Sequence, residues 1–306
     1  MELPIILLKA ICHMALLLIA APFFEGIIRK ITAWIQSRRG PPLWQPYYDL
    51  LKLLGKEDME SGESPFMQRF AVILSLSGPM VLAAFLPLLG GSSLAQQSDV
   101  ILFIYLLVFC GVANLLVGLS AGSTYSLLGT SREMMSAITL EPLLVVALVI
   151  GAIHADSLQL AKILSGSVYE VAGIPWSGLV MAAIIGFSFQ AFIGRIPFDI
   201  AEAETEIMEG PIIEYSGPKL ALLKWSHMAK LVIYASIITC LFLPWGNEWM
   251  FPLGMLVFWI KVIAIVLAVT VIAATHARWR IDQSIRYFMS FWGVAFWALL
   301  LAIWGY

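Results

Sequence analysis

The acidic residues that could handle protons are concentrated in one short segment between two apolar stretches. Segment 195–218 reads RIPFDIAEAETEIMEGPIIEYSGP, and Pro197 and Pro211 lie on either side of its centre. Its acids are Asp199, Glu202, Glu204, Glu206, Glu209 and Glu214. On one continuous helix, four of these acids would share a face: Asp199, Glu202, Glu206 and Glu209. Such like charges repel one another unless they are solvated, paired with cations or partly protonated.

Two interpretations of this carboxylate segment stay open at the sequence level. It could be a solvated acidic loop. Apolar residues interleave with the acids, however, and apolar runs flank the segment, which favours partial burial. Carboxylates grouped in a low-dielectric site have raised and mutually coupled pKa values, which suits the uptake and release of protons near neutral pH. We therefore predict a proton-handling role.

Glu141 is a second candidate, because it lies in the apolar run SAITLEPLLVVALVIG with no lysine or arginine. A lone carboxylate at membrane depth is a functional candidate by default. The following Pro142 frees a backbone carbonyl and can kink a helix, which gives water or a neighbouring group access. The alternative is that Glu141 lies at the aqueous interface and is simply hydrated.

Two lysines, Lys230 and Lys261, also fall within apolar runs. Placing a lysine in a membrane is costly, so such a residue usually faces a protein interior or a water-filled cavity. Near a helix end it can instead extend its ammonium group to the surface. We place both lysines with the acids as candidates for an ion path.

A basic patch consists of Arg38-Arg39-Gly40-Pro41 together with Arg29, Lys30 and Lys52. It could bind anionic lipid headgroups or dock an acidic partner. Next to it, residues 41–58 carry leucines and tyrosines at helical spacing, which predicts an amphipathic helix along the membrane surface or against a partner.

The cysteines and histidines argue against a redox centre held by this chain. The cysteines are Cys12, Cys110 and Cys240, each isolated in an apolar run, and no CxxC motif exists. An iron–sulfur cluster or attached haem is therefore not expected. The histidines are His13, His154, His227 and His276, which lie singly along the chain, although a haem between two spans is conceivable. We expect no metal site, no cofactor and no catalytic residue here, so any electrons would travel in a partner.

The composition sets the class of fold that must position these groups. Of 306 residues, 60% are apolar and 12% are charged, about half the charge of a soluble domain. Apolar runs predict an all-α membrane protein with about eight spans in one domain, residues 1–306. The spans are expected near 4–24, 70–89, 101–120, 134–153, 176–194, 222–243, 250–275 and 287–305. The net charge of −2 gives no indication of nucleic acid as a partner.

The connections between these spans alternate in charge, which predicts sidedness. Thirteen of the eighteen basic residues fall in four loops, expected near 25–69, 121–133, 195–221 and 276–286, and Lys224 lies just beyond the third. The positive-inside rule makes these loops cytoplasmic and places both termini on the outer side.

Three blocks of sequence resemble the membrane H-subunit family of respiratory complex I, which includes the equivalent subunit of energy-converting nickel–iron hydrogenases such as formate hydrogenlyase. These blocks are QSRRGPPLWQPYYDLLKLLGKED at 36–58, SREMMSAITLEP at 131–142 and RIPFDIAEAETEIMEGPIIEYSG at 195–217. The resemblance implies a subunit that anchors a peripheral redox arm to antiporter-like membrane subunits. It places the family's acidic path on Glu141, Asp199, Glu202, Glu204, Glu206, Glu209 and Glu214. It places the family's basic-loop pattern on Arg38, Arg39, Gly40, Pro41, Gln45, Asp49 and Lys52, to which we add Arg195.

Departures from the quinone-using branch favour the hydrogenase branch. Here GPP-LW-Q is shorter than the matching loop of that branch, and FIGR replaces its E-x-N-R before the PFD motif. The expected function is a non-redox coupling subunit in a prokaryotic cytoplasmic membrane, contacting lipid. Its expected partners are hydrogenase large and small subunits, an iron–sulfur protein and antiporter-like subunits, which would hold the nickel–iron centre and the clusters. A quinone-site subunit of complex I is the alternative, and a stand-alone secondary transporter is a third hypothesis.

Overall fold

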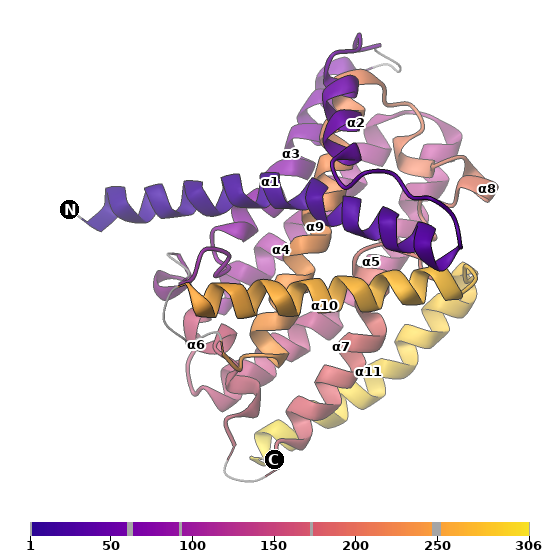
Figure 1. Ribbon diagram of the computed structural model, residues 1–306. Helices are drawn as coiled ribbons and strands as arrows, with labels where there is room; N and C mark the ends of the chain where they lie inside the picture. Colours follow the sequence, from indigo (N-terminus) through magenta and orange to yellow (C-terminus); the bar gives the residue numbers. More distant parts are fainter. Residues whose placement is uncertain (1, 60–63, 92–93, 172–173, 247–251, 306) are drawn as a thin grey trace.

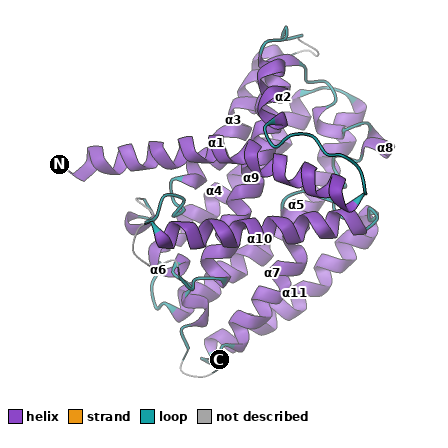
Figure 2. Cartoon of the chain, viewed as in Figure 1, coloured by secondary structure: helices purple, strands orange, loops and turns teal. Residues whose placement is uncertain are grey.

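The described part of the chain consists of helices and short connections. The computed structural model describes residues 2–59, 64–91, 94–171, 174–246 and 252–305 (Figure 1). Within these ranges it contains no β-strand, only an isolated bridge between Asp99 and Gln159 (Figure 2). The all-helical fold class expected from the sequence is confirmed.

Seven of the described helices are long and apolar enough to cross a membrane. They are α1 (Glu2–Ile35), α3 (Pro65–Ala83), α4 (Val100–Ser120), α5 (Thr124–His154), α9 (Gly217–Phe242), α10 (Leu253–Thr275) and α11 (Ile281–Ile303). An eighth apolar helix, α7 (Trp176–Phe192), has 17 residues, at the lower limit of about 17–25 for a span. The shorter elements are α2 (Gln45–Leu54), α6 (Leu160–Leu164), α8 (Glu204–Ile207) and the 3₁₀ turns η1 (Ala95–Gln97), η2 (Ser167–Tyr169) and η3 (Gly210–Ile212). These helices match the eight expected spans in order.

Two helices extend well beyond their expected spans. The first, α1, continues to Ile35. In this extension, Gly26 lets the helix backbone pack directly against the Leu43 carbonyl, because a Cβ atom at position 26 would come within 2.1 Å of the carbonyl oxygen. The fourth span begins at Thr124, because the Ser123 hydroxyl caps the helix by accepting from the Ser126 amide at 3.2 Å. Residues 25–35 and 124–133, which were expected in loops, are therefore helical.

The carboxylate segment, expected as a loop near 195–221, is not one continuous helix, so four of its acids do not share a helical face. Among the described residues between α7 and α9, the only α-helical ones are the four of α8, and Gly210–Ile212 form the 3₁₀ turn η3. Beyond α8, the chain turns sharply through Met208, Glu209 and Gly210, whose φ angles are 50°, 68° and 47°. Pro211 follows this turn, and a proline is incompatible with the interior of a helix.

The central helix of the molecule is α9, and α11 lies at its edge. Of the most apolar stretch of α9, 78% is buried, against 22% in α11. In Figure 1, α1 and α10 cross in front of the other helices, and both pack against α9. The exposed apolar faces of the outer helices are available to lipid or to other subunits.

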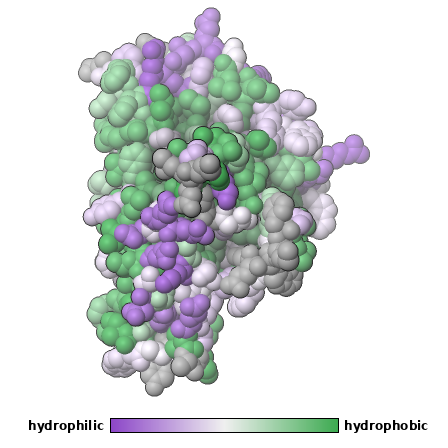
Figure 3. Space-filling view, turned by 90° about the vertical axis from the view of Figure 1, so that its left-hand side faces the viewer, coloured by the Kyte–Doolittle hydropathy of each residue, from purple (hydrophilic) through white to green (hydrophobic). Residues whose placement is uncertain are grey.

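The amphipathic helix expected in the first loop is α2. It buries Pro46 and Leu50 and exposes Tyr48 and Leu51. The Tyr47 hydroxyl donates to the Ile19 carbonyl, which ties α2 to α1. On the face of the molecule from which the N-terminal end of α1 projects, hydrophilic side chains form a band between hydrophobic margins (Figure 3).

Candidate functional site

Three cavities with shared walls lie around α9 and the carboxylate segment. The large cavity, about 440 Å³, lies among α1, α9, α10 and residues 194–212. The central cavity, about 80 Å³, lies among α4, α5, α9 and the carboxylate segment. The small cavity, about 40 Å³, adds a residue of α3 to its wall. Glu202 and His227 line all three, so this pair stands where the cavities meet.

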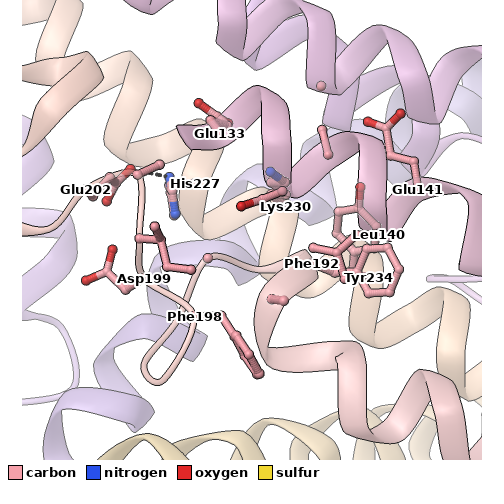
Figure 4. A pocket seen from close by; sticks show the side chains of 17 residues that line it. Glu133, Leu140, Glu141, Phe192, Phe198, Asp199, Glu202, His227, Lys230 and Tyr234 are labelled. Carbon is pink, nitrogen blue, oxygen red and sulfur yellow. Dashed lines mark ion pairs between the residues drawn. The ribbon is translucent and has the colours of Figure 1, made fainter. Parts of the chain in front are cut away.

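Glu202 and His227 form the contact at this junction. The Nδ1 atom of His227 lies 3.3 Å from Oε1 of Glu202, as the dashed line in Figure 4 marks. The Glu202 side chain is 32% exposed and faces the cavities. Burial, reinforced by the negative charge of Asp199, raises the pKa of Glu202 to about 7 against the opposing charges of Arg195 and Lys230. This carboxyl can therefore exchange a proton near neutral pH.

Lys230 separates two further carboxylates in the central cavity. His227, Lys230 and Tyr234 follow one another at i, i+3 and i+7 on one face of α9. Glu133 and Glu141 lie two turns apart on α5, and in Figure 4 Lys230 lies between them. Among the side chains that the structure describes, no carboxylate oxygen lies within 4.0 Å of the Lys230 ammonium group. The ammonium group is near both acids and bound to neither.

A hydrogen-bonded network lines the small cavity beside Glu133. The Ser75 hydroxyl donates to Asn114 Oδ1 at 2.8 Å, and the Ser226 hydroxyl donates to the Ser75 carbonyl at 2.6 Å. The two hydroxyl oxygens are 3.1 Å apart. These polar groups in the wall of the small cavity can form hydrogen bonds with a water molecule or a transferred proton.

A chain of ion pairs forms one wall of the large cavity and reaches α2. Glu25, only 8% exposed, pairs with Arg195 and, at 3.4 Å, with Arg29. Arg29 also pairs with Asp49 at 2.7 Å, and Gln45 donates to the same carboxylate at 3.0 Å. Burial would raise the pKa of Asp49, but these hydrogen bonds hold it below its ordinary value. The first loop and the carboxylate segment are thus joined through α1.

The other acids of the carboxylate segment occupy different surroundings. Asp199 lines the large and central cavities and pairs with Arg278 at 2.9 Å, and Glu209 lines the large cavity. Glu206 is exposed at a surface cleft, where it pairs with Arg132 at 2.6 Å. Glu214 is half-buried and lines none of the three cavities. The side chain of Glu204 lies outside the described residues.

Lys261, the second lysine predicted for the ion path, lies apart from the cavities. Its ammonium group donates to the carbonyl of Leu243 at 2.6 Å and to that of Trp245. Both carbonyls follow the C-terminal end of α9. Lys261 belongs to α10, but its ammonium group lies at the C-terminal end of α9. A cation there satisfies carbonyl groups that have no partner within the helix.

The residues predicted for docking divide into three groups. Arg38, Arg39 and Lys52 are exposed. Gly40 and Pro41 form the half-exposed turn between α1 and α2. The remaining three, Gln45, Asp49 and Arg195, belong to the chain of ion pairs that passes through Glu25 and Arg29 of α1.

The comparison with known families agrees with this architecture. A family model described as NADH dehydrogenase matches residues 8–303. The chain belongs to the NADH dehydrogenase family.

Two similar proteins are named as a hydrogenase component and a formate hydrogenlyase subunit. The chain is 36% identical over 277 residues to Hydrogenase-4 component C of Escherichia coli (strain K12), covering 89% of this chain and 88% of that protein. It is 34% identical over 295 residues to Formate hydrogenlyase subunit 4 of the same strain, covering 94% and 95%. The resemblance inferred from the three sequence blocks is confirmed.

A solved structure supports the same family and fold. The chain matches a chain in the structure of an archaeal respiratory membrane complex, the membrane-bound sulfane sulfur reductase, with a TM-score of 0.84 and 25% identity. The match covers 97% of this chain and 99% of that chain. The fold therefore recurs in a membrane subunit of a respiratory complex.

Sequence reasoning did not single out Glu133, His227 or Glu25 for the site. Glu133 precedes Glu141 by eight residues, a same-face spacing that shows only once α5 extends before residue 134. His227 precedes Lys230 by three residues on α9, which was the available signal. Glu25 and Arg29 have the i, i+4 spacing of a helical ion pair, but this part of α1 was expected to be a loop.

Proposed function

We propose that this chain is the non-redox coupling subunit of a multi-subunit membrane-bound hydrogenase of the formate hydrogenlyase type. Electron transfer in a docked peripheral arm changes the charge near the carboxylate segment. Protons or sodium ions then move along the carboxylates toward Glu141. The chain itself holds no redox centre in this proposal, so the nickel–iron centre and iron–sulfur clusters belong to its partners.

The observation that carries this proposal is the continuity of titratable groups along the shared cavity walls. Glu202 and His227 stand at the junction, Glu133 and Lys230 follow, and Glu141 lines the central cavity on the side opposite Glu202 in Figure 4. Titratable groups with water-sized spaces between them are what proton transfer through a protein needs. A solvated acidic loop would not bring these groups from α5, α9 and the carboxylate segment to one place.

The exposed basic residues of the first loop support a docking surface for the peripheral arm. Arg38, Arg39 and Lys52 project next to α2, whose exposed face also carries Tyr48 and Leu51. The proposed partners there are the hydrogenase large and small subunits and the iron–sulfur protein. Antiporter-like membrane subunits and lipid contact the exposed apolar helices. The proposed location is the prokaryotic cytoplasmic membrane, with both termini on the outer side.

Replacement of Glu141 by Gln tests the proposal in the assembled complex. Because glutamine cannot bind or release a proton at neutral pH, Glu141→Gln is expected to abolish ion translocation in proteoliposomes while dye-linked hydrogen oxidation continues. Glu170→Gln is the matched control, because Glu170 follows η2 and lines none of the three cavities. Full translocation by the Glu141→Gln complex would remove Glu141 from the path.

The large cavity supports one alternative, a quinone-site subunit of complex I. Its volume of about 440 Å³ suits a small organic ligand, and Ile28, Leu223, Met228 and Val269 give it an apolar wall. A purified complex that contains bound quinone and lacks nickel would favour this alternative. A co-purifying nickel-containing large subunit without quinone would favour the hydrogenase proposal.

A further inference from the structure

Gly111 of α4 lies directly against the carboxylate of Glu141. A Cβ atom built on Gly111 would come within 2.5 Å of Glu141 Oε1 and 3.7 Å of its carboxyl carbon. Both residues line the central cavity. The space that a side chain at position 111 would occupy is therefore filled by the Glu141 carboxylate, a member of the proposed path.

The backbone of α4 gives no other reason for a glycine at this position. Gly111 lies in the middle of a regular helix, and its φ angle is not in the positive region. A glycine there is less favourable than alanine by about 1 kcal/mol. Gly186 on α7 provides a contrast, because a Cβ atom on it would meet nothing within 4 Å. A side chain at position 111 would thus meet an ionisable group, whereas one at position 186 would enter open space.

We infer that Gly111 is a positioning residue that holds the Glu141 carboxylate at its place in the central cavity. This inference rests on the proposed function, because ion translocation is its readout. With alanine at position 111, the carboxylate has to move away from α4, since the Cβ contact is far below any normal approach. The side chain of Glu141 can rotate, so the helix packing survives while the carboxylate leaves its position.

The test compares Gly111→Ala with Glu141→Asp and with the double variant in the assembled complex. Gly111→Ala is expected to lower ion translocation roughly tenfold, because small misplacements of a reacting group have large effects on rate. The shorter acid in Glu141→Asp leaves room for the alanine. We therefore expect the double variant to translocate ions as well as Glu141→Asp alone. Gly186→Ala, the matched control, is expected to match the wild type.

The outcomes separate this inference from the proposed function. Normal translocation by Gly111→Ala, together with loss in Glu141→Gln, overturns the positioning role and leaves the proposed function standing. Normal translocation by Glu141→Gln overturns both. If the Gly111→Ala complex does not assemble, the double variant decides: assembly with the translocation of Glu141→Asp supports the inference, and failure to assemble shows that the role of Gly111 is in packing.

Discussion

The surroundings of Lys230 and Lys261 differ sharply, although both lysines lie in apolar helices and gave the same sequence signal. Lys230 faces the central and small cavities together with Glu133. Lys261 donates to two backbone carbonyls beyond the end of α9. The comparison teaches that a charge in an apolar run identifies a costly group, and that the groups around it decide whether it serves ion transfer or structure.

After Glu141→Gln, the largest effect is expected from Lys230→Met. This substitution removes the positive charge that lines the central cavity together with Glu133 and Glu141, and with it the cation of the proposed ion path. We expect ion translocation in proteoliposomes to fall at least about tenfold while dye-linked hydrogen oxidation continues. Retained translocation would show that the position of Lys230 in the cavity has no functional consequence.

A pH-dependent effect is expected from Glu202→Gln at the junction of the cavities. The fold favours the protonated form of Glu202, whose pKa is raised from 4.5 to about 7 by burial and by Asp199. The stability that this preference gives is present below pH 4.5 and is lost as the pH rises through 7. The Glu202→Gln complex should therefore gain thermal stability over the wild type as the pH rises from about 5 to 8.

Translocation should follow the same titration. We expect an inflection near pH 7 in the wild type that is absent in Glu202→Gln. Asp282→Asn is the control, because Asp282 is an exposed acid that pairs with Arg280 at the surface. An unchanged pH profile in Glu202→Gln would contradict the role of the junction.

The smallest effect on coupling is expected from Lys261→Met. This substitution removes two charge-assisted hydrogen bonds at the end of α9, so we expect a loss of stability of about 2 kcal/mol. Thermal denaturation of the purified complex measures this loss, and translocation per hydrogen oxidised should stay unchanged. A coupling defect as large as that of Lys230→Met would erase the distinction between the two lysines.

The fold could be predicted from the sequence to the level of its spans, because about 20 consecutive apolar residues are sufficient evidence for a membrane helix. The helix ends could not be predicted in the same way. The extensions of α1 and α5 carry charged residues that form tertiary contacts, such as the pair of Glu25 with Arg195 and that of Arg132 with Glu206. Hydropathy alone therefore assigned these turns to loops.

The sequence identified several acids of the candidate site, but it did not predict how they are arranged. Glu141, Asp199 and Glu202 were singled out, and all three line the central cavity. Glu206 lies apart from these acids in its pair with Arg132, and the segment that follows it is fixed by the turn at Met208–Gly210 and by the packing of Pro211 near Gly129. That packing joins residues more than 80 positions apart, which no spacing rule within one helix describes.

The most direct test of the account is whether a carboxyl at the junction changes protonation when the docked redox centres are reduced. Infrared difference spectroscopy of the assembled complex, recorded on reduction in H₂O and D₂O, measures this through the carboxyl C=O stretch. We expect a deuterium-sensitive band in the wild type that is lost in Glu202→Gln and kept in Asp282→Asn. The same band in all three complexes, or no band in the wild type, would contradict the coupling of electron transfer to the carboxylates.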